Sequence, residues 1–496
     1  MDCVITSKED ILAIYKADNR PWVIGFSGGK DSTAVCRLVF EALLELPLLE
    51  RTKPVFVVSS DTLVETPLVV NLIREALDKM RVAAAELALP IEVAEPVTPR
   101  IDETFWVNLI GNGYPAPSRQ FRWCTERMKI DPTSEFIREK VAAFGEVVVV
   151  LGSRIQESSS RAQVIRKHRI DGSRLGKHTS LPHALVFTPI DEWSADDVWE
   201  YLFSGPAPWG GDHQALFDLY KGSNGGECPL VLDTSTPSCG NSRFGCWVCT
   251  VVTKDRAMDG LIETGNTWLI PLRDFRNELY KTTDPARKHE FRSARRRDGS
   301  VTVAIKKDDQ GKTIQEKHVL GPYRLEYRKH LLRELLKSQK EIYESNPKDA
   351  QELITHSELE QIRTEWRSDP NEPDWEDSVP AIYREVFSNE VAWKTDDDFV
   401  FDGNDAIVVA ELCAERRLPK ELLMKLLELE VSYQGHARRS GLQKEMQELL
   451  SRDWADDQQA VASQSEWINK VSSYDAQERD LQKRYADIGK VIGDAD

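Results

Sequence analysis

The sequence predicts an α/β fold: a doubly wound, mostly parallel sheet, followed by a Cys-rich loop module and a mainly helical C-terminal region. Between about residues 20 and 205, short apolar runs rich in β-branched residues alternate with longer helix-forming stretches. Strands that are apolar on both faces and separated by helices pair in parallel through right-handed crossovers. Ligands of such sheets bind beyond the carboxyl ends of the strands.

The strands of this sheet are expected where β-branched and aromatic residues form short continuous runs. The runs are residues 22–26, 55–59, 91–94 and 147–151. Each run is followed by helix-forming sequence or by a loop. The predicted α/β domain spans residues 1–205.

After residue 205 the alternating pattern ends, and Gly, Pro, Ser and Asn become frequent. Cys228, Cys239, Cys246 and Cys249 fall in this stretch. We therefore expect a loop-rich Cys module over residues 206–275, held by something other than a hydrophobic core.

Residues 276–496 are charged and mostly helical in pattern, with a short hairpin predicted near residues 300–320. In the hairpin, residues 301–305 and 313–319 flank a polar turn. One further helix starts near Pro419, which suits a first helical turn. Four apolar residues of this helix share one face, which predicts a core contact without chemistry: Leu422, Leu426, Leu429 and Tyr433.

Bulk composition limits the classes of function. The formal net charge of the 496 residues is −17, which argues against a protein that coats nucleic acid by charge alone. The N-terminus has acidic residues where a signal peptide needs a basic start, and no long apolar run follows, so a cytoplasmic protein is expected. In a reducing compartment the eight cysteines are unsuited to disulfides, so their spacing points to metal ligation or catalysis.

Residues 23–33 run from a predicted strand through two glycines into a predicted helix. Glycines allow backbone N–H groups to close on an anion, the helix start adds its positive dipole end, and Lys30 adds a mobile cation. The pattern is not a Walker A loop, because Ile24 replaces the first glycine and Asp31 follows the lysine. The segment is therefore expected to bind phosphate in another way.

The hexapeptide Ser-Gly-Gly-Lys-Asp-Ser resembles the PP-loop of the adenine-nucleotide α-hydrolase superfamily. The resemblance implies that ATP is split between its α- and β-phosphates, that AMP is transferred to a substrate oxygen, and that Mg²⁺ bridges the phosphates. It implies catalytic roles for Lys30, Asp31 and Ser32. The implied nucleotide-binding residues of the loop are Ser27, Gly28, Gly29, Lys30, Asp31 and Ser32.

Three further segments resemble the branch of this superfamily that contains the phosphoadenylyl-sulfate (PAPS) reductases. Residues 59–66 end the second predicted strand, where the family contacts adenosine, which makes Asp61 a candidate. Residues 151–161 are similar to a Gly-x-Arg-x-x-Glu-Ser segment, which implies that Arg154 and Arg161 face phosphates. In the third segment Ser194 is expected to cap a helix, a structural role.

The cysteine spacing predicts a metal centre. Cys246 and Cys249 form a CxxC pair, with Cys239 seven residues upstream and Cys228 as a further candidate. Four such ligands bind Zn²⁺ or a [4Fe–4S] cluster. Cys124 lies in an Arg-Trp-Cys-Thr segment that also resembles the reductase branch, whose iron–sulfur members pair an early Cys with a later CxxC. The resemblance therefore favours a [4Fe–4S] cluster on Cys124, Cys239, Cys246 and Cys249, with Cys228 as the substitute.

A sulfonucleotide reductase of this branch carries a Glu-Cys-Gly-x-His motif near its C-terminus, which this sequence lacks. The PP-loop, the Arg-Trp-Cys-Thr segment, the Phe-Gly-Cys-Trp-Val-Cys segment and the long helical tail together are similar to the DndC family of bacterial DNA phosphorothioation. This resemblance implies an ATP pyrophosphatase that activates a DNA phosphate oxygen for replacement by sulfur. DNA, a cysteine desulfurase and other proteins of the system would be its partners. A PAPS reductase-like enzyme, another PP-loop thiolase and a non-catalytic scaffold remain alternatives.

Two basic runs are candidates for DNA contacts, although solvated surface explains such runs as well. The first run comprises Arg161, Arg166, Lys167, His168 and Arg169, and the second comprises Arg287, Lys288, Arg292, Arg295, Arg296 and Arg297.

Overall fold

The computed structural model describes residues 2–223, 245–307, 313–394, 402–435, 439–452, 454, 457–471 and 474. The chain forms two compact units. The first comprises Met1–Asn108, Ala116–Lys281 and Glu334–Glu358, and the second comprises Leu109–Pro115, Thr282–Arg333 and Leu359–Asp496. The three-part division expected from composition stays a prediction.

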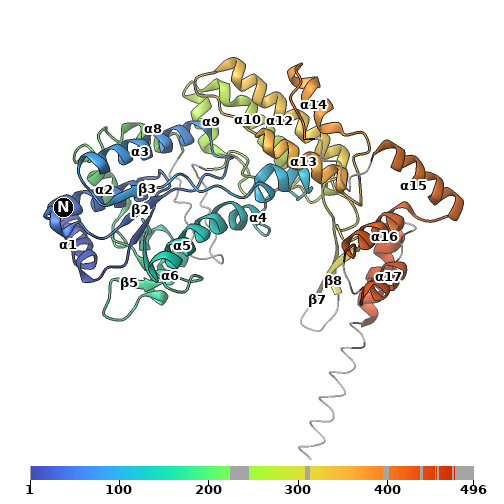
Figure 1. Cartoon of the computed structure of the whole chain (residues 1–496), viewed down its shortest axis with the longest axis horizontal. Helices are drawn as coiled ribbons and strands as arrows, with labels where there is room; N and C mark the ends of the chain where they lie inside the picture. The colour runs from blue at the N-terminus through green and yellow to red at the C-terminus, as the bar shows by residue number, and fades with distance from the viewer. Residues whose placement is uncertain are drawn as a thin grey trace, which may run out of the picture. The chain divides into compact units, whose positions relative to one another are not determined.

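A six-stranded sheet forms the centre of the first unit, in the order β3-β2-β1-β4-β6-β5 (Figure 1). Neighbouring strands are parallel except β5 and β6, which are antiparallel. The strands are β1 (Trp22–Gly25), β2 (Val55–Val58), β3 (Ile91–Val93), β4 (Val147–Val150), β5 (Leu175–Lys177) and β6 (Ala184–Phe187). The four predicted strands are confirmed, each one residue shorter than expected, whereas β5 and β6 were not predicted.

Helices precede, separate and follow the strands of the first unit. They are α1 (Asp2–Ala17), α2 (Lys30–Glu45), α3 (Pro67–Glu86), α4 (Trp123–Thr125), α5 (Asp131–Phe144), α6 (Ser159–His168), α7 (Ala195–Phe203), α8 (Gln214–Ser223), α9 (Arg256–Glu263) and α10 (Ile270–Lys281). Short 3₁₀ or π turns are η1 (Leu48–Glu50), η2 (Ile101–Glu103), η3 (Val107–Gly111), η4 (Glu126–Ile130), η5 (Ile155–Glu157) and η6 (Thr267–Leu269).

Helices cover both faces of the sheet, as the side chains of β1 show. Trp22 and Ile24 pack in one apolar layer with residues of α1, α2, α3 and α7, whereas Val23 packs in the other layer with Ile137 of α5. Successive residues of a strand point to opposite faces, so both faces of β1 are buried. This confirms the predicted doubly wound, mostly parallel α/β fold.

From residue 282 onward the described chain is mainly helical, which confirms the prediction for the C-terminal region. Its elements are α11 (Lys288–Phe291), β7 (Thr302–Lys307), β8 (Thr313–Val319), α12 (Leu325–Ser345), α13 (His356–Ser368), α14 (Ser378–Phe387), α15 (Gly403–Arg416), α16 (Lys420–Ser432) and α17 (Leu442–Leu450). Strands β7 and β8 are antiparallel, as the predicted hairpin requires, and residues 308–312 of its turn lie outside the described residues.

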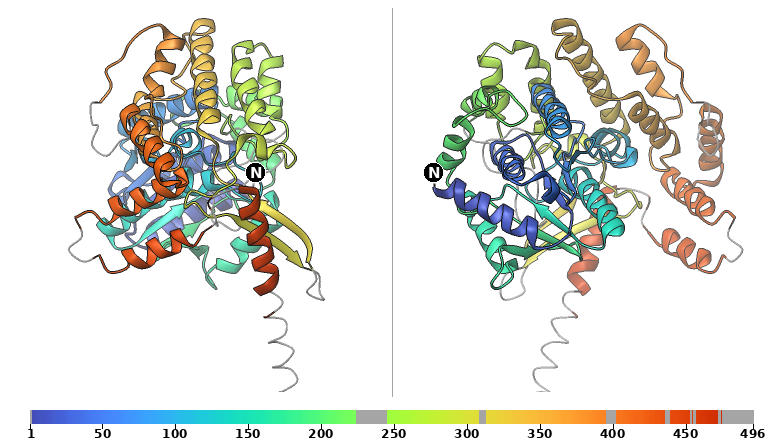
Figure 2. Two further views of the ribbon diagram at one scale, coloured as in Figure 1. Left: turned by 90° about the vertical axis from the view of Figure 1, so that its right-hand side faces the viewer. Right: turned by 60° about the vertical axis from the view of Figure 1, so that its left-hand side comes forward.

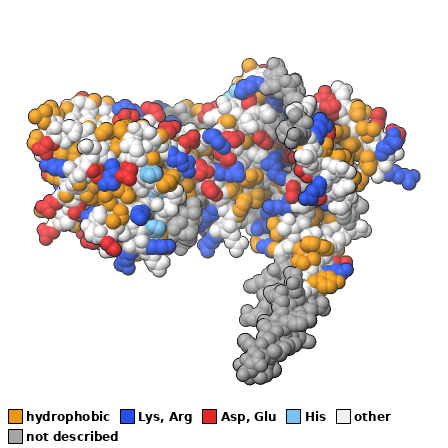
Figure 3. Space-filling model, turned by 60° about the horizontal axis from the view of Figure 1, so that its bottom comes forward, with side chains coloured by type: hydrophobic (Ala, Val, Ile, Leu, Met, Phe, Trp, Pro, Cys, Tyr) orange, Lys and Arg blue, Asp and Glu red, His pale blue; other side chains and the backbone are white. Residues whose placement is uncertain are grey.

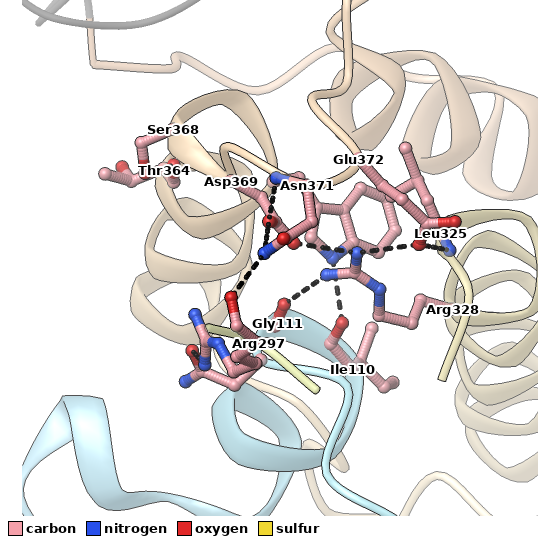
Figure 4. Close-up of polar contacts among 12 residues, drawn as sticks. Ile110, Gly111, Arg297, Leu325, Arg328, Thr364, Ser368, Asp369, Asn371 and Glu372 are labelled. Atoms are coloured by element: carbon pink, nitrogen blue, oxygen red, sulfur yellow. Dashed lines mark hydrogen bonds and ion pairs between the residues drawn. The ribbon is translucent and has the colours of Figure 1, made fainter. Parts of the chain in front are cut away.

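The interior of the second unit is organised around a buried arginine (Figure 4). Arg328 is 1% exposed, and its guanidinium donates to the carbonyl oxygen of Gly111 at 2.6 Å and to the carboxylate of Asp369 at 3.0 Å. The indole N–H of Trp366 donates to the carbonyl oxygen of Ile110 at 2.8 Å. These bonds satisfy carbonyl groups of the segment Leu109–Pro115, which explains how an early piece of chain belongs to this unit.

The predicted helix near residue 420 is α16, and its apolar face packs as expected. Leu422 and Leu429 are buried with Leu449 and Trp454, and Leu426 and Tyr433 pack against them. No described helix is both long enough and apolar enough to cross a membrane.

Candidate active site

The loop of residues 27–32 connects β1 to α2 at the carboxyl end of the central strand. Gly28 has φ +70°, and a Cβ atom there would lie 2.4 Å from Cγ1 of Ile73, so both conformation and space require glycine. The hydroxyl oxygens of Ser27 and Ser32 lie 3.1 Å apart, and the backbone N–H of Ser27 donates to the Ser32 hydroxyl at 3.2 Å. Helix α2 begins at Lys30 without a side-chain cap, which directs its positive dipole end into the loop.

Lys30 and Asp31 form a buried charge network with Arg154. The Lys30 ammonium donates to the Asp31 carboxylate at 3.0 Å, and the Arg154 Nε donates to the other carboxylate oxygen at 2.6 Å. All three residues are at most 5% exposed. The cation that the sequence places on this loop is therefore held in a buried ion pair. Two cations surround one carboxylate, which leaves a net positive charge in a buried loop that is shaped for an anion.

The segment after β4 packs directly on this loop. A Cβ atom on Gly152 would lie 2.7 Å from the carbonyl carbon of Asp31 and 2.9 Å from the backbone nitrogen of Ser32. Only glycine allows so close an approach of two backbones. The approach brings Arg154, two residues later, against Asp31, and its guanidinium also donates to the carbonyl oxygen of Trp193 at 3.3 Å.

Tyr220 of α8 also contacts the loop of residues 27–32, although the sequence motifs did not identify it. Its hydroxyl accepts a hydrogen bond from the backbone N–H of Lys30 at 3.3 Å, and its ring lies 5.1 Å below the Lys30 ammonium. The same hydroxyl would be 3.2 Å from a Cβ atom on Gly29. Tyr220 therefore contacts the first N–H group of α2, where a phosphate oxygen would bind.

The other predicted nucleotide residues lie at neighbouring loops. Asp61 follows β2, accepts a hydrogen bond from the backbone N–H of Leu63 at 2.8 Å, and lies 3.7 Å from Arg74. Arg161 of α6 pairs with Glu157. Ser194 has the predicted structural role, because its hydroxyl accepts from the backbone N–H of Asp197 at 3.1 Å in a capping box.

Three of the predicted metal ligands come together in the structure. Burial raises the pKa of the Cys124 thiol to about 12, and the neighbouring Cys246 and Cys249 act in the same direction. Burial likewise raises the pKa of Cys246 to about 11. Lys129, four residues after α4, lies 3.8 Å from Glu65, and Glu65 pairs with Cys246, so α4 and the CxxC segment are close. Cys239 and its substitute Cys228 lie outside the described residues.

The described part of the chain holds no group of three His, Cys, Asp or Glu side chains placed to surround a metal ion. The sulfur of Cys246 instead lies 3.4 Å from the Thr62 hydroxyl. The thiols are thus gathered in one place without forming a complete ion site among themselves.

The loop that carries Asp61 also holds the CxxC segment. Glu65 pairs with Cys246 in an antiparallel bridge, and the backbone N–H of Trp247 donates to the carbonyl oxygen of Val64 at 2.9 Å. Residues 61–66 therefore join the nucleotide end of β2 to the thiols through backbone hydrogen bonds.

The CxxC segment also has an apolar core, contrary to the expectation for residues 206–275. Trp247 is 2% exposed and packs against Trp106 at 5.7 Å and Phe275 at 5.8 Å between ring centroids. Buried Arg276 donates to the carbonyl oxygens of Cys249 at 2.9 Å and Thr253 at 2.9 Å. The expectation failed because these aromatic partners come from distant or later parts of the chain.

Comparisons with known proteins agree with this geometry. Residues 21–251 match the family model described as phosphoadenosine phosphosulfate reductase domain. Residues 21–251 are thus similar to a phosphoadenosine phosphosulfate reductase domain and are called the PAPS reductase-like domain below. The PAPS reductase-like domain includes β1 to β6, the nucleotide loop and the CxxC pair.

A curated relative of the PAPS reductase-like domain is an uncharacterised protein of Methanocaldococcus jannaschii, 29% identical over 204 residues. The match covers 41% of this chain and only 36% of that protein. The solved structures include a Candida glabrata FMN adenylyltransferase in complex with FAD and pyrophosphate, at 15% identity and TM-score 0.26, covering 42% of this chain and 58% of that one. A U34-tRNA thiolase from Methanococcus maripaludis with its [4Fe–4S] cluster shares 16% identity at TM-score 0.25, covering 44% of this chain and 74% of that one.

Proposed function

We propose that the PAPS reductase-like domain binds ATP on residues 27–32 and splits it between the α- and β-phosphates. The observation that carries this proposal is the buried Lys30–Asp31–Arg154 network directly beneath a helix N-terminus. Backbone N–H groups and the Ser27 and Ser32 hydroxyls would bind the phosphates, and positive charge would stabilise the departing pyrophosphate.

Arg154 has a specific part in this proposal. When ATP binds, the Lys30 ammonium must turn from Asp31 toward phosphate. Arg154 lies 2.6 Å from Asp31 and continues to compensate the buried carboxylate, so releasing Lys30 leaves no unpaired negative charge. Mg²⁺ would enter with the phosphates and retain several water molecules, because this ion needs few protein ligands when it bridges a nucleotide.

The oxygen that receives AMP would be a non-bridging phosphate oxygen of DNA, which is then replaced by sulfur. This part is supported by the resemblance to the DndC family, and it makes DNA, a cysteine desulfurase and other phosphorothioation proteins the expected partners. The long C-terminal region beyond residue 251, which the family model does not match, is consistent with a role beyond that of a small reductase.

A [4Fe–4S] cluster fits the chemistry of the gathered thiols. Cys124, Cys246 and Cys249 would hold it, with Cys239 or Cys228 as fourth ligand. The three described ligands are free, partly exposed cysteines, and metal binding would replace their thiol protons. When bound, such a cluster supplies redox chemistry or sulfur ligation beside the nucleotide loop.

Mass spectrometry of digested DNA tests the function directly. Cells that express the wild-type chain with its partners should contain phosphorothioate dinucleotides, and cells with Lys30→Ala should contain none. Lys79→Ala, which removes an exposed lysine from α3, is the matched control and should behave as wild type. Dinucleotides at the wild-type level in Lys30→Ala would contradict the proposal. Release of sulfite from PAPS by the purified protein would identify a reductase instead.

A further inference from the structure

Four cations of the second unit lie together around α11 and β8: Lys288, Arg292, Arg296 and Lys317. The guanidinium groups of Arg292 and Arg296 donate to the carbonyl oxygens of Gly321 at 2.7 Å and Leu320 at 3.2 Å, directly after β8, which carries Lys317. The backbone N–H of Arg292 donates to the carbonyl oxygen of Lys288 at 3.2 Å. Burial lowers the pKa of Lys288, and the charges of Lys317 and Arg292 lower it further, against a weaker effect of Asp284. Burial also lowers the pKa of Arg292, and the charge of Arg296 adds to this effect while Tyr323 opposes it. Each cation is thus within electrostatic reach of another.

None of these four cations has a carboxylate within ion-pair distance among the described side chains. Their neighbours differ: Arg287 pairs with Glu290 at 2.7 Å, and Arg295 pairs with Asp457 at 2.7 Å. Positive and negative side chains are interspersed over much of the described surface that Figure 3 shows. Among the described side chains this group of like charges has no ion-pair partner, which indicates a surface that meets an anionic partner.

The backbone beneath these cations is fixed. A Cβ atom on Gly321 would lie 1.6 Å from the carbonyl oxygen of Arg295, and the N–H of Gly321 donates to the carbonyl oxygen of Ser293 at 2.7 Å. Asn371 donates to the carbonyl oxygen of Arg297 at 3.1 Å (Figure 4). The backbone that carries Arg292 and Arg296 is therefore ordered before any partner binds, which lowers the entropy lost on binding.

The sequence run 287–297 does not act as one surface. Arg295 is buried against Trp454, and the guanidinium of Arg297 donates to Asn112. The guanidinium of Arg292 donates hydrogen bonds to the carbonyl oxygens of Gly321, at 2.7 Å, and Leu320. Lys317 lies outside this run. It belongs to the group through its place on β8, where it pairs with Ala304 on the exposed face of the hairpin. The paired strands β7 and β8 project from their unit (Figure 2).

We propose that Lys288, Arg292, Arg296 and Lys317 form a binding surface for the phosphate backbone of duplex DNA. An open group of neighbouring cations suits a polyanion whose charges repeat along its length, whereas a single small anion requires an enclosed site. The net charge of −17 repels DNA from the rest of the chain, so DNA binding needs a local cationic surface of this kind. The inference rests on the proposed function for its partner, and it adds where the duplex binds.

Fluorescence anisotropy with the full chain and a short labelled duplex, measured over a series of salt concentrations, tests the surface. Each lost phosphate contact lowers the magnitude of the salt slope by about one. The double variant Lys288→Ala/Lys317→Ala should lower it by about two and weaken binding on the order of 10–100-fold at 0.1 M salt. The control Arg384→Ala/Lys444→Ala removes two exposed charges from the same unit and should keep the wild-type slope. Equal melting temperatures of all three proteins establish that each is folded.

An unchanged slope in Lys288→Ala/Lys317→Ala would overturn the inference and leave the proposed function standing. Equal affinity of the wild type for poly-glutamate and for duplex DNA would show a site for acidic proteins and overturn it too. Pyrophosphate release from ATP separates the two proposals. A wild-type chain that binds duplex through these lysines but forms no AMP would keep the surface and refute the proposed function.

Discussion

Asp31→Asn should destabilise the protein in the absence of nucleotide and increase its response to pyrophosphate. The substitution keeps the shape of the side chain but leaves Lys30 and Arg154 as two buried cations without their common carboxylate. Removing one partner of a buried ion pair costs about 3–5 kcal/mol. At about 1.5 °C per kcal/mol for the roughly 300 residues of the first unit, the melting temperature should fall by about 5–8 °C.

Pyrophosphate should restore much of this loss, because its charge compensates the two cations. An anion that binds the folded state stabilises it in proportion to its affinity, so the increase in melting temperature with pyrophosphate should be larger in Asp31→Asn than in wild type. Calorimetry with and without pyrophosphate measures both effects.

Asp78→Asn is the matched control for this experiment. Asp78 pairs with Arg81 at 2.6 Å, the same distance as in the Asp31–Arg154 pair, but its side chain is 71% exposed. Exposed pairs contribute about 0.2–1 kcal/mol, so this variant should melt close to wild type with no gain from pyrophosphate. If Asp31→Asn melts like Asp78→Asn, or responds to pyrophosphate less than wild type, the assignment of the buried network to phosphate binding is refuted.

Further substitutions test other parts of the site. Lys30→Ala should abolish pyrophosphate release while the protein stays folded, because Arg154 continues to compensate Asp31; release at the wild-type rate would place the nucleotide elsewhere. Tyr220→Phe should tighten pyrophosphate binding by about 0.5–1.5 kcal/mol, because it frees the Lys30 N–H from a competing acceptor, and weaker binding in titration calorimetry would show that the hydroxyl contacts the ligand. Protein purified without oxygen should be brown with about four irons per chain and should lose them in Cys246→Ser, whereas zinc without iron would reject the cluster. Iron retained in Cys239→Ser but lost in Cys228→Ser would assign the fourth ligand to Cys228.

The parts of the fold that sequence predicts are those with local causes. The strand at residues 22–25 is apolar on both faces because helices cover both sides of the sheet, and this burial is visible as an uninterrupted run. The loop of residues 27–32 can be recognised in the sequence because Gly28 supplies a backbone conformation that few other residues adopt. The antiparallel strand β5 has the sequence Leu-Gly-Lys, without a β-branched or aromatic residue, so no apolar run marks it.

The parts that sequence could not predict depend on contacts between distant residues. Lys30 is buried because Tyr220, 190 residues later, contacts it. Its partner Asp31 also pairs with the distant Arg154. The segment 109–115 joins the second unit through Arg328, 217 residues after Gly111. Nothing in the local pattern of either segment indicates which distant side chain will supply the hydrogen bond.

The central claim is that the loop of residues 27–32 splits ATP between its α- and β-phosphates. Chromatography of the products from ATP labelled at the α- and γ-phosphates, with duplex DNA and the partner proteins present, tests it most directly. AMP and pyrophosphate should form in equal amounts in the wild type, and both should be absent in Lys30→Ala. Formation of ADP and inorganic phosphate, or AMP formation that persists in Lys30→Ala, would contradict it.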